Sequence, residues 1–284
     1  MIRKMISVIG SGTMGNGIAH VFAMSSDVQQ VFLVDINDEI LESAQSIIRK
    51  NLDRQVKKDI ISESDSNRFY NKIIFTTEID KVSSSDLIVE AVKEDLNIKK
   101  SIFSKLDTIT SDNTILATNT SSISITDIAM STKKPGNVIG MHFMNPVPIM
   151  KLVEIIKGKN TDNSIVKRTL DYVSSIGKIA VECNDSPGFV SNRILMPMIN
   201  EAAFTYMEGV ADADAIDQIM KLGMGHPMGP LKLADLIGID VCVSIMNVLF
   251  EGFKDEKYRA CPLLETMIED GKLGVKSKEG FYKY

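Results

Sequence analysis

Met5-Ile6-Ser7-Val8-Ile9-Gly10-Ser11-Gly12-Thr13-Met14-Gly15 is the stretch of sequence that decides the fold. An apolar run typical of a strand ends in a G-x-G-x-x-G pattern, and a segment of helical period follows it. In such a turn Gly10 permits the tight bend, Gly12 lets a pyrophosphate approach the backbone, and Gly15 lets the helix pack closely on the strand. The phosphates would lie against the amides that open the helix, at Thr13 and Met14. The stretch therefore predicts a dinucleotide-binding turn.

Asp35 ends the next apolar run, 25 positions after Gly10. An acidic residue at this place binds the hydroxyls of the adenosine ribose. Its carboxylate would repel a 2′-phosphate, and no arginine follows it in Leu33-Val34-Asp35-Ile36-Asn37. We therefore expect NAD, rather than NADP, as the cofactor.

The chain outward from this turn alternates strand-like and helix-like segments. Asn37 is the expected N-cap of a second helix, whose apolar residues recur at helical spacing. Strand–helix alternation predicts an α/β fold with a doubly wound, Rossmann-like and mostly parallel sheet. The expected strands are Met5–Gly10, Gln30–Asp35, Ile73–Thr76, Asp86–Ala91, Thr114–Thr118, Val138–Phe143, Lys151–Ile156 and Lys178–Val181.

The pattern changes after Asp185-Ser186-Pro187-Gly188, where only helical segments follow. We expect an NAD-binding domain over 1–185 and a smaller all-α domain over 186–284, which completes the substrate site and forms a dimer. The helices predicted for this second domain are Phe189–Glu208, Asp214–Lys221, Pro230–Phe253 and Leu263–Asp270.

Composition narrows the class of protein. At about 150 residues per domain, 284 residues suggest two domains. The net charge of −5 argues against nucleic acid as a partner, and no apolar stretch approaches the ~20 residues that span a bilayer. Three scattered cysteines without C-x-x-C spacing argue against disulfides and metal clusters. We expect a soluble cytoplasmic protein with no metal site and no membrane partner.

A histidine base would have to be His20, His142 or His226. His20 falls off the apolar face of the first helix and is expected to meet solvent, while His226 stands in a turn that suits capping or packing. His142 comes near the carboxyl end of a predicted strand, the edge at which open α/β sheets bind ligands. By position His142 is the strongest candidate of the three.

Three blocks of sequence then carry a resemblance: Asn119-Thr120-Ser121-Ser122, Gly140-Met141-His142-Phe143-Met144-Asn145-Pro146 and Lys151-Leu152-Val153-Glu154. They resemble the 3-hydroxyacyl-CoA dehydrogenases, and most closely their bacterial 3-hydroxybutyryl-CoA members. The likeness continues, in the family's order, through Pro187-Gly188-Phe189-Val190, Asn192-Arg193 and His226-Pro227-Met228-Gly229-Pro230 to Gly280-Phe281-Tyr282. The family departs from this chain at Ser25–Gln30, where it has a shorter turn, and at Lys93, where it has an apolar residue.

The resemblance implies an enzyme that interconverts (3S)-3-hydroxyacyl-CoA and 3-ketoacyl-CoA of short chain length, in fatty-acid or butanoate metabolism. His142 would be the general base, and Glu154 would bind its far nitrogen. Ser121 would hydrogen-bond the 3-oxygen of the substrate, and Asn192 would complete the site at the thioester. An imidazole suits this role because it titrates near neutral pH.

The resemblance also assigns cofactor, CoA and dimer contacts. Glu94 and Lys99 would contact the ribose and nicotinamide side of NAD, with Asn119 and Asn145 near the same side. The basic face of the second helix would bind the phosphates of CoA through Arg54 and Lys58. A homodimer would form through the helical domain, whose apolar faces are Val190, Ile194, Met198, Ala202 and Tyr206, and Ile237, Val241, Ile245 and Leu249.

Two other classes of protein share this plan. A β-hydroxyacid dehydrogenase would use a lysine base rather than a His–Glu pair, so the His142 block argues against it. A crystallin-like structural relative or a cofactor-binding regulatory protein could use the same fold without catalysis. The retained Ser121, His142, Glu154 and Asn192 argue for an enzyme. The physiological direction and the range of acyl chains stay open.

Overall fold

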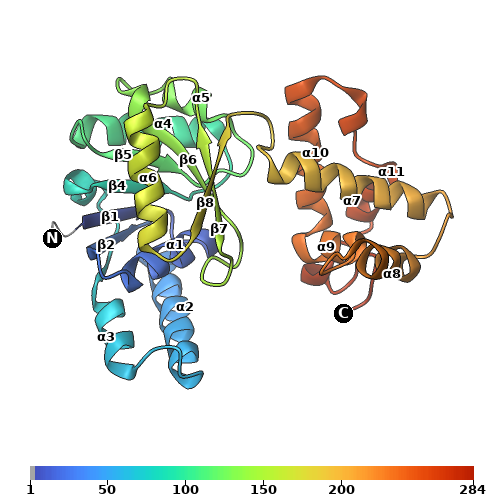
Figure 1. Cartoon of the computed structure of the whole chain (residues 1–284), viewed down its shortest axis with the longest axis horizontal. Helices are drawn as coiled ribbons and strands as arrows, with labels where there is room; N and C mark the ends of the chain where they lie inside the picture. The colour runs from blue at the N-terminus through green and yellow to red at the C-terminus, as the bar shows by residue number, and fades with distance from the viewer. Residues whose placement is uncertain (1–3) are drawn as a thin grey trace. The chain divides into compact units, whose positions relative to one another are not determined.

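Within residues 4–284, which the computed structural model describes, eight strands form one sheet (Figure 1). The strand order is β3-β2-β1-β4-β5-β6-β7-β8. The strands are β1 (Lys4–Ile9), β2 (Val28–Val34), β3 (Ile73–Thr76), β4 (Leu87–Glu90), β5 (Ile115–Thr118), β6 (Val138–Phe143), β7 (Leu152–Lys157) and β8 (Ile179–Asn184).

All neighbouring strands are parallel except β6 and β7, which run antiparallel. The order reverses at β1, because β2 lies on one side of it and β4 on the other. This reversal creates the crevice at the carboxyl ends of the strands in which doubly wound sheets bind nucleotides. The predicted fold class is confirmed.

Six α-helices of this part of the chain pack around the sheet: α1 (Thr13–Met24), α2 (Asp38–Lys57), α3 (Glu63–Asn71), α4 (Leu96–Ile109), α5 (Ile125–Ala129) and α6 (Asn163–Ser175). In Figure 1, α6 lies across the front of the sheet, and α2 and α3 run side by side. The predicted cap of α2 is confirmed, since the Asn37 side chain accepts a hydrogen bond from the Ile40 amide at 2.9 Å. Two short 3₁₀ helices, η1 (Ile79–Ser84) and η2 (Pro135–Asn137), complete the connections.

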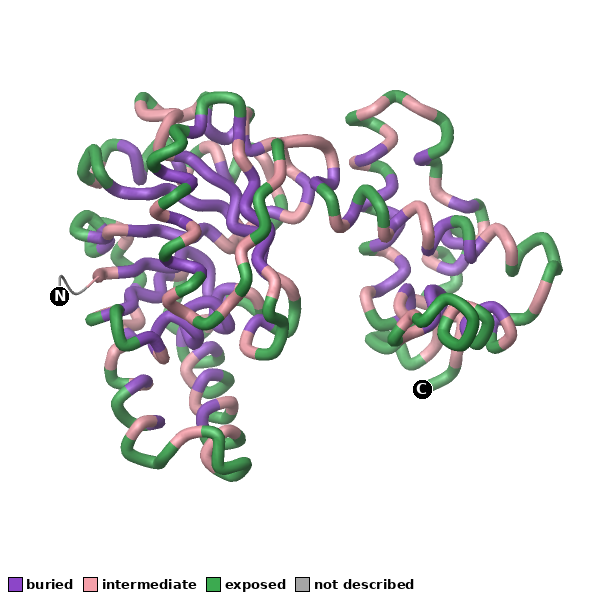
Figure 2. The backbone as a smooth tube through the Cα atoms, viewed as in Figure 1, coloured by how far each residue is buried: buried purple, intermediate pink, exposed green. Residues whose placement is uncertain are grey.

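The central strands are buried along their length, as Figure 2 shows in purple. His20 on α1 belongs to this interior, and the expectation that it meets solvent is wrong because it is 1% exposed. Its Nε2 lies 3.1 Å from the Gln55 side-chain amide of α2, which covers that face of α1. Burial lowers the pKa of His20 to about 4, so the ring is neutral at physiological pH.

The chain divides into two compact units, a sheet unit that ends at Asp185 and a helical unit that runs from Ser186 to Tyr284. The helical unit contains α7 (Ser191–Met207), α8 (Ala213–Met224), α9 (Pro230–Ile237), α10 (Ile239–Phe253) and α11 (Pro262–Glu269), with η3 (Glu256–Tyr258) and η4 (Val275–Ser277).

The single helix predicted over Pro230–Phe253 is wrong. Gly238 has a φ of +107°, which L-residues rarely adopt, and it separates α9 from α10 at an angle of 97°. Among the described residues, no single helix has the length and apolar character to cross a membrane, and only this bent pair passes on length and composition.

Two buried aspartates hold the last residues of the chain to the helical unit. Asp235 accepts hydrogen bonds from the Phe281 and Tyr282 amides, both at 2.9 Å, and Asp217 accepts one from the Tyr282 hydroxyl at 2.8 Å. Burial raises the pKa of Asp235, and the amide donors oppose that shift. The Gly280-Phe281-Tyr282 block is thus a structural clamp.

Candidate active site

The glycine turn between β1 and α1 has the geometry that a dinucleotide requires. Gly10 has a φ of +93°, and a Cβ on Gly15 would lie 1.8 Å from the Gly10 carbonyl oxygen, so both positions exclude side chains. A Cβ on Gly12 would meet nothing within 4 Å. The N-terminus of α1 has no side-chain cap and no acidic residue in its first turn, so the amides of its first residues, Thr13 and Met14, suit an anion. These residues fit the pyrophosphate of a dinucleotide.

Asp35 follows β2 at the same edge of the sheet. Its carboxylate accepts hydrogen bonds from the Ser11 amide at 2.6 Å and the Ser11 hydroxyl at 2.8 Å, which tie it to the glycine turn. The Ile36 amide donates to the other oxygen at 2.7 Å. The carboxylate therefore stands fixed beside the turn, as binding of an adenosine ribose requires.

His142 and Glu154 are direct cross-strand partners on β6 and β7. His142 Nδ1 lies 2.7 Å from Glu154 Oε2, and the two residues are 8% and 4% exposed. Because Glu154 can only accept when ionised, Nδ1 carries the proton and Nε2 is the nitrogen that can accept one. A buried imidazole oriented in this way by a carboxylate is suited to general acid–base catalysis.

Ser121 lies in the loop after β5, and Glu94 holds that loop. Glu94 accepts hydrogen bonds from the Ser121 amide at 2.9 Å and from the Thr120 hydroxyl. Burial acts to raise the pKa of Glu94, but the Lys99 ammonium and these hydrogen bonds outweigh it and hold the pKa below its usual value. Glu94 is thus an ionised acceptor beneath the serine loop.

Lys99 is 1% exposed on α4, and its ammonium pairs with Glu90 Oε1 at 2.7 Å and with Glu94 Oε2 at 3.2 Å. Sequence reasoning missed Glu90, the fully buried last residue of β4. One signal was available, because an acidic residue at the end of an otherwise apolar strand needs a buried partner, and Lys99 follows nine positions later.

Asn119 ties β5 to β6, since its side-chain oxygen accepts a hydrogen bond from the Phe143 amide at 2.9 Å. Asn145 is exposed two residues after β6 ends and forms a cis peptide bond with Pro146. Asn192 is 8% exposed in the first turn of α7 and therefore belongs to the helical unit. Within the sheet unit the structure thus brings the glycine turn, Asp35, Glu94, Ser121 and the His142–Glu154 pair to the carboxyl edge of the parallel strands.

A groove of about 660 Å³ lies in the sheet unit between the second half of α2 and the loop that joins β6 to β7. Arg54 and Lys58 line it from α2, and Lys151 and Lys178 line it from the opposite side. Lys178 also fixes the loop, because its ammonium donates to the Val147 and Met150 carbonyl oxygens, both at 2.6 Å. Sequence reasoning found the α2 face of this groove but not its second wall.

Residues 5–186 match the NAD binding domain of the 3-hydroxyacyl-CoA dehydrogenases, and residues 188–284 match the C-terminal domain of the same proteins. The chain belongs to the 3-hydroxyacyl-CoA dehydrogenase family. The family resemblance is therefore confirmed, and NAD is the cofactor of the family's first domain.

Individual family members match along nearly their whole length. The chain is 48% identical to the 3-hydroxybutyryl-CoA dehydrogenase of Clostridioides difficile over 98% of this chain and 99% of that protein. It is 47% identical to a probable 3-hydroxybutyryl-CoA dehydrogenase of Bacillus subtilis over 99% and 97% of the two chains. The crystal structure of the (S)-3-hydroxybutyryl-CoA dehydrogenase of Ralstonia eutropha superposes with a TM-score of 0.95 at 41% identity, covering 99% of both chains.

Proposed function

We propose that this protein is an NAD-dependent dehydrogenase that interconverts (3S)-3-hydroxyacyl-CoA and 3-ketoacyl-CoA, with the four-carbon pair 3-hydroxybutyryl-CoA and acetoacetyl-CoA as substrates. The buried His142–Glu154 pair, in the unit that carries the dinucleotide turn, is the observation that supports it most. In the cell the enzyme would act in fatty-acid or butanoate metabolism, in the oxidation or the formation of short acyl chains.

In this mechanism bound NAD supplies the acceptor for the hydride from C3 of the alcohol. His142 Nε2 takes the hydroxyl proton, and Glu154 stabilises the imidazolium through Nδ1. Ser121 hydrogen-bonds the 3-oxygen, and Asn192 supports the thioester side. In the reverse direction the imidazolium returns its proton to the 3-oxygen as the ketone is reduced.

Glu94, Lys99, Asn119 and Asn145 are proposed to serve the ribose and nicotinamide side of the cofactor. Glu94 is 37% exposed and can reach a ligand directly, whereas the buried Lys99 ammonium would act through Glu94. Asn119 would act by fixing the ends of β5 and β6 relative to each other.

One spectrophotometric assay tests the function and the cofactor preference together. With acetoacetyl-CoA as substrate, we expect oxidation of NADH, and a kcat/KM with NADPH lower by about 100-fold, because a 2′-phosphate would meet the Asp35 carboxylate. A β-hydroxyacid dehydrogenase would reduce a simple keto acid instead, and a non-catalytic relative would bind NADH without turnover. A preference for NADPH would contradict the role of Asp35.

The groove between α2 and the β6–β7 loop is proposed to hold the phosphates of CoA, because four cationic side chains line it. Replacing Arg54 and Lys58 together with alanine is expected to raise KM for acetoacetyl-CoA about tenfold, with a smaller effect on kcat. The matched control replaces Lys50 and Lys57, exposed lysines of α2 that do not line the groove, so the charge change is the same. Equal KM values in the two double variants would refute the assignment.

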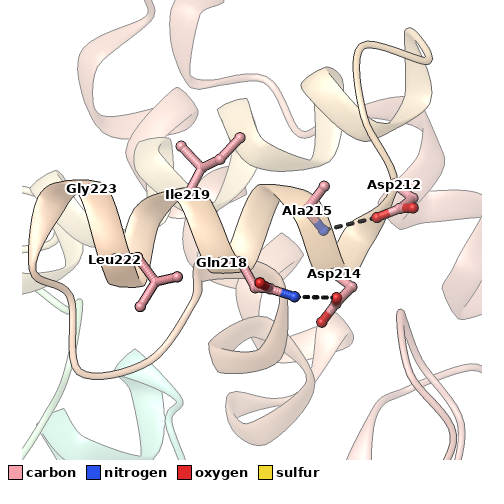
Figure 3. A pocket seen from close by; sticks show the side chains of 7 residues that line it. All are labelled: Asp212, Asp214, Ala215, Gln218, Ile219, Leu222 and Gly223. Carbon is pink, nitrogen blue, oxygen red and sulfur yellow. Dashed lines mark hydrogen bonds between the residues drawn. The ribbon is translucent and has the colours of Figure 1, made fainter.

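A homodimer through the helical unit is proposed from its exposed apolar surface. Of the apolar faces expected to meet a partner, Ala202, Ile245 and Leu249 belong to the core instead, whereas Val190 and Ile194 are exposed. Further exposed side chains project from α8, as Figure 3 shows for Ile219 and Leu222, which are 61% and 82% exposed. So much apolar surface on a unit of about 100 residues fits a self-complementary contact.

Light scattering is expected to give about twice the chain mass of 31.3 kDa. Leu222→Glu should shift the mass toward one chain, because it places a charge in the contact without disturbing the core. Met130→Glu, at a 67% exposed position of the sheet unit, is the matched control and should leave the mass unchanged. A wild-type mass of one chain would contradict the dimer.

The cytoplasm is the proposed location of the enzyme. Cys183, Cys242 and Cys261 are all free thiols, which fits a reducing compartment. Burial raises the pKa of Cys242 to about 12 and that of Cys183 to about 11, so neither is a reactive thiolate at neutral pH.

A further inference from the structure

Three charged side chains form a buried cluster where β4 ends. Glu90, Lys99 and Glu94 contribute two negative charges and one positive charge, with the Lys99 ammonium between the carboxylates at 2.7 and 3.2 Å. Glu90 and Lys99 are 0% and 1% exposed. We call these three residues the charge cluster.

Hydrogen bonds and an ion pair hold both carboxylate oxygens of Glu90. One carboxylate oxygen accepts from the Val92 amide and from Lys99, both at 2.7 Å, and the other accepts from the Thr118 hydroxyl at 2.7 Å. The Val92 amide and the Lys99 ammonium can only donate, so Oε1 accepts from both of them. The formal charges of two carboxylates and one ammonium give the charge cluster a net charge of −1.

The topology places this charge on the nicotinamide side of the cofactor crevice. β4 pairs with β1, and Glu90 stands opposite Ile9, the residue before the glycine turn. Asp35 marks the β2 side as the place of the adenosine ribose, so the other half of a dinucleotide that crosses the turn lies toward β4 and β5.

We propose that Glu90 is a positioning residue that, by binding Lys99, sets the net charge of this edge at −1 and thereby favours binding of the oxidised over the reduced nicotinamide. The oxidised ring carries one positive charge and the reduced ring carries none, so a nearby negative charge stabilises only the oxidised form. The proposal rests on NAD being the cofactor.

The test compares the dissociation constants of NAD⁺ and NADH, measured by calorimetry for four proteins. In Glu90→Gln the charge cluster becomes neutral. The ratio of the NAD⁺ dissociation constant to the NADH dissociation constant is expected to rise about 4- to 16-fold, as for one charge at roughly 10 Å in an effective dielectric of about 20–40. Glu94→Gln neutralises the cluster at a partly exposed position and should raise the ratio in the same direction. It serves as the second variant if Glu90→Gln does not fold.

The double variant Glu90→Gln with Lys99→Met restores a net charge of −1, now carried by Glu94 alone. Its ratio should return to the wild-type value, because loss of a contact to the ribose changes both constants by the same factor. Replacement of a buried ion pair by neutral side chains is often tolerated, so this protein is expected to fold. If Glu90 had only a structural role, the ratio in the double variant would not return to the wild-type value.

An unchanged ratio in both single variants, or a double variant that keeps the shifted ratio, overturns the proposal. Failure of the wild-type protein to bind either form of NAD would instead contradict the cofactor assignment, which separates the two failures.

Discussion

Replacing His142 with glutamine is expected to lower kcat by about 10²- to 10⁴-fold, the usual contribution of a positioned acid–base group. The amide keeps a polar side chain at the end of β6 but cannot take the substrate proton at neutral pH. The dissociation constant of NADH should change little, because the glycine turn and Asp35 bind the cofactor through other atoms. A His142→Gln enzyme with nearly normal kcat would show that another group is the base.

The Glu154 side of the pair is tested by a double-mutant cycle that combines Glu154→Gln with His142→Gln. Glu154→Gln leaves the base without its carboxylate, so kcat should also fall strongly, but the loss in the double variant should be much smaller than the product of the two single losses. This non-additivity is expected because the two side chains, 2.7 Å apart, act as a unit. Fully additive losses would mean that Glu154 does not act through His142.

Replacing Gly12 with alanine is expected to raise the dissociation constant of NADH by about 10- to 100-fold. The added methyl group would meet nothing in the protein within 4 Å, and the φ of −61° suits alanine. It would occupy the space through which a pyrophosphate approaches the backbone, and each lost hydrogen bond to a charged group is worth about 1.5–3 kcal/mol. The free energy of unfolding should change by less than about 1 kcal/mol.

Two further glycine variants control this experiment. Gly223→Ala, at another open position in the helical unit, should leave NADH binding unchanged. Gly15→Ala should destabilise the protein itself, because its Cβ would overlap the Gly10 carbonyl. Normal NADH affinity in Gly12→Ala would exclude close contact between this turn and the phosphates.

The sheet could be predicted from sequence because its strands are short apolar runs separated by helical segments. The spacing of Gly10, Gly12 and Gly15 is specific to a turn between a strand and a helix, so these three residues were enough to predict the turn before α1. The prediction that His20 meets solvent was wrong because the apolar periodicity of α1 does not show that a second helix, α2, covers the other side of α1. The break at Gly238 was missed because the apolar period continues through it and only a positive φ reveals the turn.

The candidate site was less accessible to sequence reasoning than the fold. His142, Glu154, Ser121 and Asn192 came from a family motif, and position alone singled out only His142. Glu90 was missed because its importance depends on Lys99 reaching it from another element. Lys178 was missed for a similar reason, since its partners are backbone carbonyl groups of a distant loop, and these leave no trace in the sequence.

The antiparallel pairing of β6 and β7 places the acid–base pair on the strands and the wall of the groove in the loop that joins them. His142 and Glu154 meet because of strand register, and a slip of one residue would turn Glu154 to the opposite face of the sheet. The loop between the two strands, however, forms a wall of the groove and contains neither member of the acid–base pair. Substitutions at exposed loop positions such as Ile149 and Met150, which line the groove, could therefore adapt it to other acyl-CoA substrates, while the cross-strand pairing keeps the acid–base pair intact.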